Sequence, residues 1–342
     1  MKKDQITVEL ATGIYLHVEL NTPPMTSKEF REKKERNSIA LDGFVKGPPW
    51  YDATGPWANY NHHEGVDRLA TDCTAAQILM AIQSGMLEAF RDENGNILIH
   101  IYVNDCDQDV CLACFFLKHH YMALQVINSN LNRLVGMENK LDKTFGTYPF
   151  PEGLKGLEEL LWIFNPYDVF KTAGGLERRD AQEYLNVITN VMGRVMDSLN
   201  NKGGSLPADN GFNQIGSGDG YVVIEEIGAN CRMGIFGGKT IAFVSVRKRP
   251  DGNMICTIAR KSEYVPFPIP AILERLNQEE ISVRAQKGVE NHQNDLWGGN
   301  ERMVIGSPRI SGTRISLEKI QEIINEEIRK NKEEIVQRRK QG

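Results

Sequence analysis

The sequence predicts an α/β protein in which an N-terminal domain with a largely parallel sheet is followed by a smaller α+β C-terminal domain. The length of 342 residues corresponds to about two domains. A buried strand at residues 97–103 leads into an acidic loop and an apolar helix, which is the repeating unit of α/β folds. After residue 220 the pattern changes to short strands. We therefore expect a metal-site domain at residues 1–200, a substrate-binding domain at 205–315 and a charged helix at 316–342.

The N-terminal elements follow from periodicity and turn signals. Residues 6–10 and 14–20 alternate between apolar and polar around Thr12-Gly13, which predicts a β-hairpin. Residues 21–38 are polar and indicate a loop or a short surface helix, and residues 42–65 are rich in Gly, Pro and aromatics, which favours an irregular loop. Further on we expect helices at 74–84, 108–117, 119–135, 154–164 and 179–199.

The C-terminal elements are mostly short strands. The Asn, Gly and Ser content of residues 201–220 predicts a linker. Strands are expected at 221–227, 233–236, 240–246 and 254–259, and a helix that begins with proline at 268–277. A Gly-rich segment at 297–312 precedes the last helix. The second half of that helix, from residue 331, is either a solvated end or a surface for homodimerisation.

Composition excludes several classes of protein. The chain has 40 Lys and Arg against 45 Asp and Glu, a net charge of −5 that does not indicate nucleic-acid binding. No apolar run approaches the roughly 18 residues of a membrane span, and the first residues show no secretory pattern. We therefore expect a cytoplasmic protein that does not bind membranes. Its six cysteines are too few for a disulfide scaffold.

Three of those cysteines have a spacing that needs a separate interpretation. Cys106, Cys111 and Cys114 form C-x4-C-x2-C, which is the beginning of one iron–sulfur pattern. Their neighbours are almost all apolar, however, whereas a cluster-binding loop would be rich in Gly and Ser. We therefore favour buried structural cysteines over a cluster or a zinc site.

The first group of residues suited to chemistry is Asn61-His62-His63-Glu64, inside the aromatic loop. A loop allows both imidazoles to turn toward one site, whereas in a strand they would face opposite sides. Asp42 and Asp52 precede this group. A pair of hydrogen-bonded loop histidines is the alternative interpretation, and it is the preferred one for His119-His120, which lie on a predicted helix.

The second group is Asp105, Asp107 and Asp109, directly after the strand at 97–103. Carboxylates this close repel one another unless a cation or hydrogen-bond donors neutralise them. Oxygen ligands suit hard divalent metals, and added imidazole shifts the preference toward Mn²⁺. Solvated acids at a helix N-terminus are the alternative. We expect a metal site.

These two groups resemble the motifs of the DHH phosphoesterase superfamily. Residues 107–113 are similar to its D-x-D, strand-to-helix motif, and Asn61-His62-His63 is similar to its D-H-H signature. The order of the two motifs is reversed in this chain, and Asn61 replaces the first Asp of the signature. A different strand order would still bring both motifs to one edge of the sheet.

The resemblance implies a metal-dependent hydrolase of a phosphoester or phosphoanhydride, acting on a small anionic phosphorylated substrate. It implies two Mn²⁺ or Mg²⁺ ions, with a metal-activated water as nucleophile. The implied metal-site residues are His62, Asp107, Asp109, Asp105, Asn61 and Asp52, with Asp42 as the alternative to Asp52 and Asp168 as a downstream candidate. Because Asn61 offers one neutral oxygen, the second ion is expected to bind weakly, and Asn61→Asp is expected to tighten it.

The same resemblance implies a catalytic role for His63 near the metals and a Gly-rich substrate loop in the second domain. Its candidate residues are Gly298, Gly299, Gly306 and Ser307, with Arg309 to hold phosphate and Arg302 or Arg314 as alternatives. The basic run at residues 247–249 is either a phosphate contact or a solvated hairpin end. Gly238-Lys239-Thr240 lacks the upstream glycine of a P-loop. The alternative to an enzyme is a catalytically degenerate binding or scaffold protein on the same fold.

Overall fold

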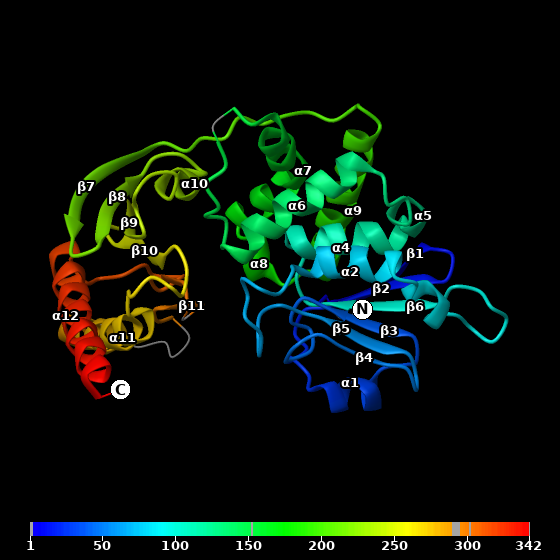
Figure 1. Ribbon diagram of the computed structural model, residues 1–342, viewed down its shortest axis with the longest axis horizontal. Helices are drawn as coiled ribbons and strands as arrows, with labels where there is room; N and C mark the ends of the chain where they lie inside the picture. The colour runs from blue at the N-terminus through cyan, green and yellow to red at the C-terminus, as the bar shows by residue number, and fades with distance from the viewer. Residues whose placement is uncertain (1–2, 152, 289–294, 301, 342) are drawn as a thin grey trace. The chain divides into compact units, whose positions relative to one another are not determined.

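A computed structural model describes residues 3–151, 153–288, 295–300 and 302–341 and shows a mixed α/β protein (Figure 1). Two six-stranded sheets and twelve helices lie within these described residues. The chain divides into two compact units, the first made of residues 1–143 with 153–207 and the second of residues 144–152 with 208–342. Each unit is described by itself.

The sheet of the first unit is mixed, with strand order β1-β2-β6-β3-β5-β4. The strands are β1 (Gln5–Ala11), β2 (Ile14–Glu19), β3 (Ser38–Leu41), β4 (Trp50–Asp52), β5 (Trp57–Tyr60) and β6 (Ile99–Val103). The inner pairings β2–β6, β6–β3 and β3–β5 are parallel. The two outer pairings are antiparallel hairpins, β1–β2 and β4–β5. The predicted N-terminal hairpin is therefore confirmed, and the sheet as a whole mixes both orientations.

Helices cover the apolar face of this sheet, and β2 shows why. Ile14, Leu16 and Val18 are fully buried on one face of the strand, while the residues between them are partly exposed on the other. Helix α9 contacts β1 and β2, and α4 packs against both α2 and α9. The helices of this unit are α1 (Ser27–Lys33), α2 (Thr74–Gln83), α3 (Met86–Ala89), α4 (Gln108–Lys118), α5 (His120–Ala123), α6 (Ser129–Lys143), α7 (Lys155–Thr172), α8 (Gly175–Arg178) and α9 (Ala181–Leu199). Helix α1 lies on the opposite side of the sheet from α2 and α4 (Figure 1).

Some predicted elements of this unit were wrong. The aromatic segment 42–65 contains strands β4 and β5, because its aromatic side chains pack against the sheet despite the flanking Gly and Pro. Strand β3 was not predicted, since its four residues follow a polar segment. Helix α7 continues through Pro166, where the sequence predicted an end at 164, and its later turns bury Tyr167 and Phe170.

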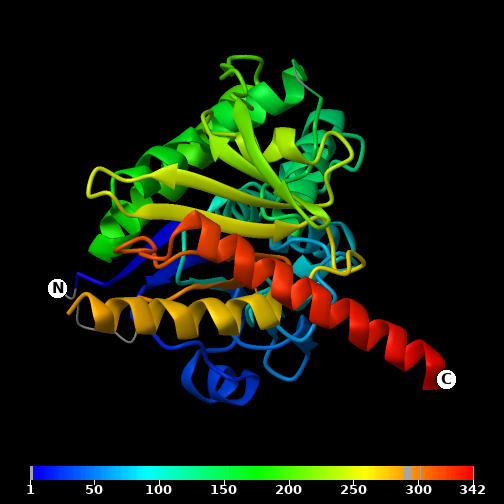
Figure 2. The ribbon, with the colours of Figure 1, turned by 90° about the vertical axis from the view of Figure 1, so that its left-hand side faces the viewer.

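The second unit contains a sheet of order β11-β12-β10-β9-β8-β7, in which β8–β9 is parallel and the other pairings are antiparallel. Its strands are β7 (Phe212–Gly218), β8 (Tyr221–Glu226), β9 (Ala242–Lys248), β10 (Met254–Arg260), β11 (Gly298–Asn300) and β12 (Val304–Gly306). Its helices are α10 (Cys231–Ile235), α11 (Ile269–Gln286) and α12 (Leu317–Gln341). Helices α11 and α12 run side by side (Figure 2) and share a core with β8, β9 and β10.

Two predictions for this unit were wrong. The expected linker 201–220 contains strand β7, whose Gly and Ser residues are accommodated by pairing with β8. The strand expected at 233–236 overlaps helix α10, in which Cys231 and Ile235 lie one helical turn apart and are both buried.

A charged network is buried inside the second unit. Arg284 on α11 is 1% exposed, and its guanidinium lies 3.2 Å from Glu280 and 3.4 Å from Asp295. Glu280 also accepts hydrogen bonds from the Thr313 hydroxyl and the Trp297 indole. Arg284 is the positive partner of both carboxylates, so loss of its guanidinium would leave the buried charges of Glu280 and Asp295 uncompensated.

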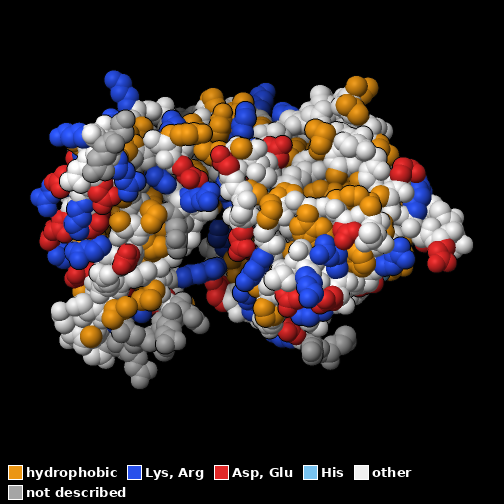
Figure 3. All heavy atoms as spheres, turned by 60° about the horizontal axis from the view of Figure 1, so that its bottom comes forward, with side chains coloured by type: hydrophobic (Ala, Val, Ile, Leu, Met, Phe, Trp, Pro, Cys, Tyr) orange, Lys and Arg blue, Asp and Glu red, His pale blue; other side chains and the backbone are white. Residues whose placement is uncertain are grey.

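On the face drawn in Figure 3, Lys and Arg side chains are interspersed with Asp and Glu. Among the described helices, none combines the length and apolar character that crossing a membrane requires.

Candidate metal centre

The two predicted groups of residues follow adjacent parallel strands of the first unit. Asp42 follows β3, His62 and His63 come shortly after β5, and residues 105–109 follow β6. Strands β6, β3 and β5 are neighbours in the sheet and run parallel. Their carboxyl ends therefore meet at one edge, which is where ligands bind in α/β sheets. The insertion of β6 beside β3 brings the two motifs together although their order in the chain is reversed.

The backbone at the end of β3 turns sharply to present Asp42. This residue adopts φ 45°, and Gly43 follows with φ 85°. A positive φ is uncommon for a residue with a side chain, although Asp tolerates it better than most. The Asp42 amide is fixed by a 2.9 Å hydrogen bond to the Tyr60 carbonyl, which ties the turn to the end of β5.

His62 lies at the centre of the cluster and is fully buried. Its Nε2 lies 2.8 Å from Asp142 Oδ2, 3.4 Å from Asp42 Oδ1 and 3.5 Å from Asp109 Oδ2. The three carboxylates come from three different elements, namely α6, the end of β3 and α4. Burial lowers the pKa of His62, but the carboxylates of Asp142 and Asp42 outweigh this effect and raise it to about 10.

Several of these atoms lack hydrogen bonds although they are buried. Both ring nitrogens of His62 and Asp142 Oδ2 have no hydrogen-bond partner in the described part of the chain. Nε2 and Oδ2 are close, but their contact does not have hydrogen-bond geometry. Buried polar atoms without partners are rare and costly. A metal ion that displaced a His62 proton would use these converging nitrogen and oxygen atoms as ligands.

His63 has a defined tautomer because of Arg68. The Arg68 guanidinium lies 2.7 Å from His63 Nδ1, and an arginine can only donate, so Nδ1 must accept. The imidazole proton is therefore on Nε2, which lies 2.7 Å from Asp42 Oδ1. The side chain is 37% exposed, so it lies at the border between the cluster and solvent. Arg68 also donates to the Asp142 carboxylate at 3.0 Å, which leaves Asp142 Oδ2 to face His62.

Asp109 has a structural role as well as a place in the cluster. The N-cap of α2, Cys73, makes no side-chain cap hydrogen bond, and the two Asp109 oxygens instead accept from the amides of Thr74 and Ala75 at 2.6 and 2.7 Å. Helix α4 thereby caps helix α2. Burial, followed by the charges of Asp142 and Asp42, raises the pKa of Asp109 to about 7.

Three further carboxyl groups surround this core. Asp107 is the N-cap of α4 and accepts from the Val110 amide at 3.0 Å. Burial, then the charges of Asp42 and Asp105, raises the pKa of Asp107 well above its usual range. Burial also raises the pKa values of Asp105 and of Glu138. Six carboxyl groups therefore interact in this region, against the Arg68 guanidinium and the His62 imidazole.

The structure gives two predicted ligands other roles. Asn61 donates from Nδ2 to the Gly47 carbonyl at 3.0 Å, and its Oδ1 accepts from the His63 amide. Both ends of this side chain are used to hold the loop. Asp52 accepts from Thr54 and pairs with Arg31 at 3.3 Å, outside the cluster, whereas the alternative candidate Asp42 is inside it.

The first part of the predicted substrate loop forms strands. Gly298, Gly299 and Gly306 belong to strands β11 and β12, where Gly298 pairs with Gly306. Glycine is needed at 299, which has φ 140° and where a Cβ would approach the Val304 carbonyl oxygen to 2.5 Å. The Ser307 hydroxyl accepts from the Cys256 amide at 3.0 Å, and Arg309 is exposed at the turn that follows.

Other candidates are resolved by burial and contacts. Arg302 lies 3.5 Å from Glu263 in the second unit. Asp168 is on α7. Its charge contributes to the raised pKa of Glu138, but less than burial and the charges of Asp142 and Asp109 do. Cys106, Cys111 and Cys114 are buried, and the groups of potential metal ligands among the described residues contain no cysteine.

The residues that sequence reasoning missed are Asp142, Glu138 and Arg68. Glu138 and Asp142 are four residues apart on α6 and so share one face of it. Their only sequence signal is that Glu138 falls among the apolar positions of an amphipathic helix, next to Leu134 and Leu141.

Comparison of the chain with protein-family models, with curated protein sequences and with solved structures gives no match.

Proposed function

We propose that this cluster binds divalent cations and that the protein is a metal-dependent hydrolase of phosphoesters or phosphoanhydrides, similar to the DHH phosphoesterases. The observation that carries the proposal is the buried His62 imidazole, which lies within 3.5 Å of three carboxylates from three different elements. A protonated His62 offsets at most one of these three negative charges, and a divalent cation that displaced its proton would neutralise more of them.

The residues present fit Mn²⁺ or Mg²⁺. Asp42, His62, Asp109 and Asp142 would hold the first ion, because two groups of potential ligands, Asp42 with His62 and His63, and His62 with Asp109 and Asp142, share His62. Asp107 and Asp105 are the candidates for a second ion, since the charge of Asp42 acts on both. A carboxylate-rich set with one imidazole favours Mn²⁺ over Zn²⁺. Once bound, the ions would make hydroxide available at neutral pH and stabilise the attacking and leaving oxygens.

The chain's own residues would do two further things. His63 holds a proton at Nε2 and is partly exposed, so it can donate that proton to a leaving oxygen. Arg68 fixes the His63 tautomer and the Asp142 carboxylate together, so it is a positioning residue. These roles support the resemblance stated above for His62, His63, Asp107 and Asp109, while the Gly-rich segment of the second unit gives it no support.

Metal-dependent turnover of a generic substrate tests the proposal. We expect purified protein to hydrolyse bis(p-nitrophenyl) phosphate or pyrophosphate in the presence of Mn²⁺ and to lose this activity in EDTA. Asp142→Asn should reduce the activity at least tenfold, whereas the matched control Asp52→Asn should retain it, because Asp52 is engaged by Thr54 and Arg31. Mn²⁺ binding without hydrolysis of either substrate would favour a binding or scaffold protein. Equal activity in both variants would refute the site.

A further inference from the structure

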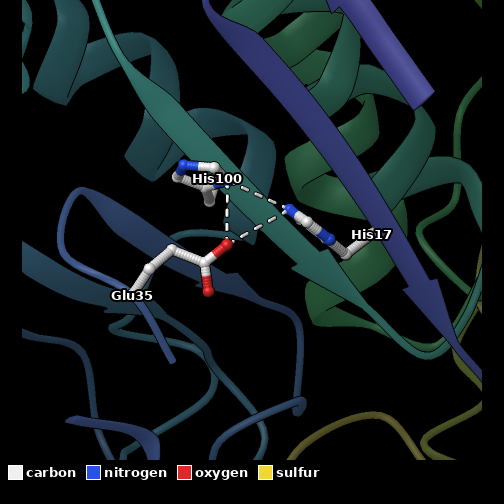
Figure 4. Close-up of side chains that lie close together, drawn as sticks. All are labelled: His17, Glu35 and His100. Atoms are coloured by element: carbon white, nitrogen blue, oxygen red, sulfur yellow. Dashed lines mark hydrogen bonds and ion pairs between the residues drawn. The ribbon is translucent and has the colours of Figure 1, made fainter. Parts of the chain in front are cut away.

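A second group of metal-ligating side chains lies in the first unit, apart from the cluster just described. It consists of His17 on β2, His100 on β6 and Glu35 in the loop between α1 and β3 (Figure 4). Tyr15 and His17 alternate with the buried residues of β2, so they face the side of the sheet away from α9. In the register of β2 and β6, Tyr15 pairs with His100 and His17 with Tyr102.

The three ligand atoms are spaced as the ligands of one tetrahedral ion would be. His17 Nε2 and His100 Nδ1 are 3.1 Å apart, His100 Nδ1 and Glu35 Oε1 are 3.0 Å apart, and His17 Nε2 and Glu35 Oε1 are 3.8 Å apart. A point about 0.8 Å out of the plane of these three atoms lies roughly 2.1 Å from each, within the range of Zn–N and Zn–O bonds of about 2.0–2.2 Å. In Figure 4 the three side chains point toward one another.

Neighbouring groups orient each ligand. The Thr7 hydroxyl contacts His17 Nδ1 at 3.0 Å, so the proton of that ring can be held at Nδ1, which leaves the Nε2 lone pair for a ligand bond. The Tyr102 hydroxyl donates to Glu35 Oε2 at 2.6 Å, so Oε1 faces the histidines. Partners of this kind, which bind the far side of each ligand, are characteristic of metal sites in proteins.

Aromatic packing holds the two imidazoles in place. The His17 ring stacks on Tyr102 with centroids 4.4 Å apart and an interplanar angle of 8°, and the His100 ring stacks on Tyr15 at 5.3 Å and 16°. Burial lowers the pKa values of both histidines, which favours the neutral form that binds metals. The nearby cation Lys34 is paired with Glu19 at 2.6 Å.

We propose that His17, His100 and Glu35 form a Zn²⁺ site with an open fourth position for a water or a small anion. Two imidazoles and one carboxylate favour Zn²⁺ over Mn²⁺ or Mg²⁺, in contrast to the carboxylate-rich cluster around His62. The Glu35 side chain is 44% exposed, so the site is accessible to solvent and to an incoming ion. Bound Zn²⁺ would connect β2, β6 and the α1–β3 loop.

Competition with a chromogenic zinc chelator tests this site. We expect the wild type to retain one more tight equivalent of Zn²⁺ than His100→Ala or His17→Ala, while the control His120→Ala matches the wild type. Tyr102→Phe and Thr7→Val should each weaken this equivalent about 10–100-fold, as loss of a partner that orients a ligand does. The same number of tight equivalents in the wild type and His100→Ala would overturn the proposal.

Two further measurements keep the test independent of folding and of the proposed hydrolase. If His100→Ala does not fold, NMR of the wild-type imidazole nitrogens should show that one equivalent of Zn²⁺ shifts His17 and His100 and leaves His120 unchanged; unshifted His17 and His100 signals would overturn the proposal. Because the two sites share no residue, a folded His100→Ala protein should bind Mn²⁺ at the His62 cluster with the affinity of the wild type. Loss of Mn²⁺ binding in that variant would contradict the existence of a separate site.

Discussion

Replacing Asn61 by aspartate should destabilise the protein and should not improve its metal binding. Asn61 is 1% exposed, and its Nδ2 donates to the carbonyls of Gly47 at 3.0 Å and Val45 at 3.4 Å. A carboxylate has no proton to donate, so an oxygen would face these two carbonyl oxygens. The motif resemblance alone predicts the opposite result, namely tighter binding of a second ion.

The contacts of Asn61 set the magnitude of the expected loss. Two lost hydrogen bonds cost about 1 kcal/mol each, and a buried charge without a partner raises the total to about 3–5 kcal/mol. The hydrogen bond that Oδ1 accepts from the His63 amide would survive in the variant. We therefore expect the loop to remain recognisable but the free energy of unfolding to fall.

Urea unfolding in EDTA, followed by circular dichroism, measures this loss, and Mn²⁺ titration calorimetry measures the binding. The matched control is Asn94→Asp, because Asn94 is exposed in a turn and its change should stay within about 0.5 kcal/mol. An Asn61→Asp protein that is as stable as the wild type and binds Mn²⁺ more tightly would refute the assignment of Asn61 as a structural residue.

Three other predictions concern Arg68, His62 and Arg284. Arg68→Gln should weaken Mn²⁺ binding about 10–100-fold in calorimetry, because Arg68 orients Asp142; unchanged affinity would contradict that role. The pKa of His62 is about 10 in the folded protein, whereas the ordinary value is 6.5, so the folded state holds more protons than the unfolded state between pH 7 and 9. The free energy of unfolding of the metal-free protein should therefore fall as pH rises, by up to about 1.4 kcal/mol per pH unit. Bound Mn²⁺ should weaken this dependence. Stability that rises with pH in EDTA would contradict it. Arg284→Met should lower the free energy of unfolding by about 3–5 kcal/mol, since Glu280 would remain buried with its charge uncompensated; a change under 1 kcal/mol in urea unfolding would show that the network is not needed.

The sequence predicted elements correctly where a local pattern is compatible with a single secondary structure. The alternation on both sides of Thr12-Gly13 predicted the hairpin, and the strand that leads into Asp105–Asp109 predicted the β6–α4 unit, whose polar end lies at the carboxyl edge of the sheet. The acidic loop was found for the same reason, because it follows a buried strand, whereas His62 was found because it stands beside His63 in a segment rich in Gly, Pro and aromatics. Proximity of the two groups depended on the insertion of β6 beside β3, which no local pattern encodes.

The remaining residues were missed because their role depends on tertiary packing. Glu138 and Asp142 lie on an amphipathic helix, where acids are usually solvated, and only the packing of α6 near α2 and α4 buries them. Arg68 is in an irregular segment without any periodic signal. In the second unit, glycines at 298 and 299 favour a loop by propensity, yet pairing with β12 makes them a strand.

The existence of the metal centre can be tested most directly by anomalous diffraction at the manganese edge from crystals soaked in Mn²⁺. The account predicts a peak about 2.0–2.3 Å from His62 Nε2 and within bonding distance of an oxygen of Asp142. It also predicts that Asn61 keeps its contacts with the Gly47 and Val45 carbonyls in the same crystal. A well-ordered soaked crystal with no peak between His62 and Asp142 would contradict the central claim.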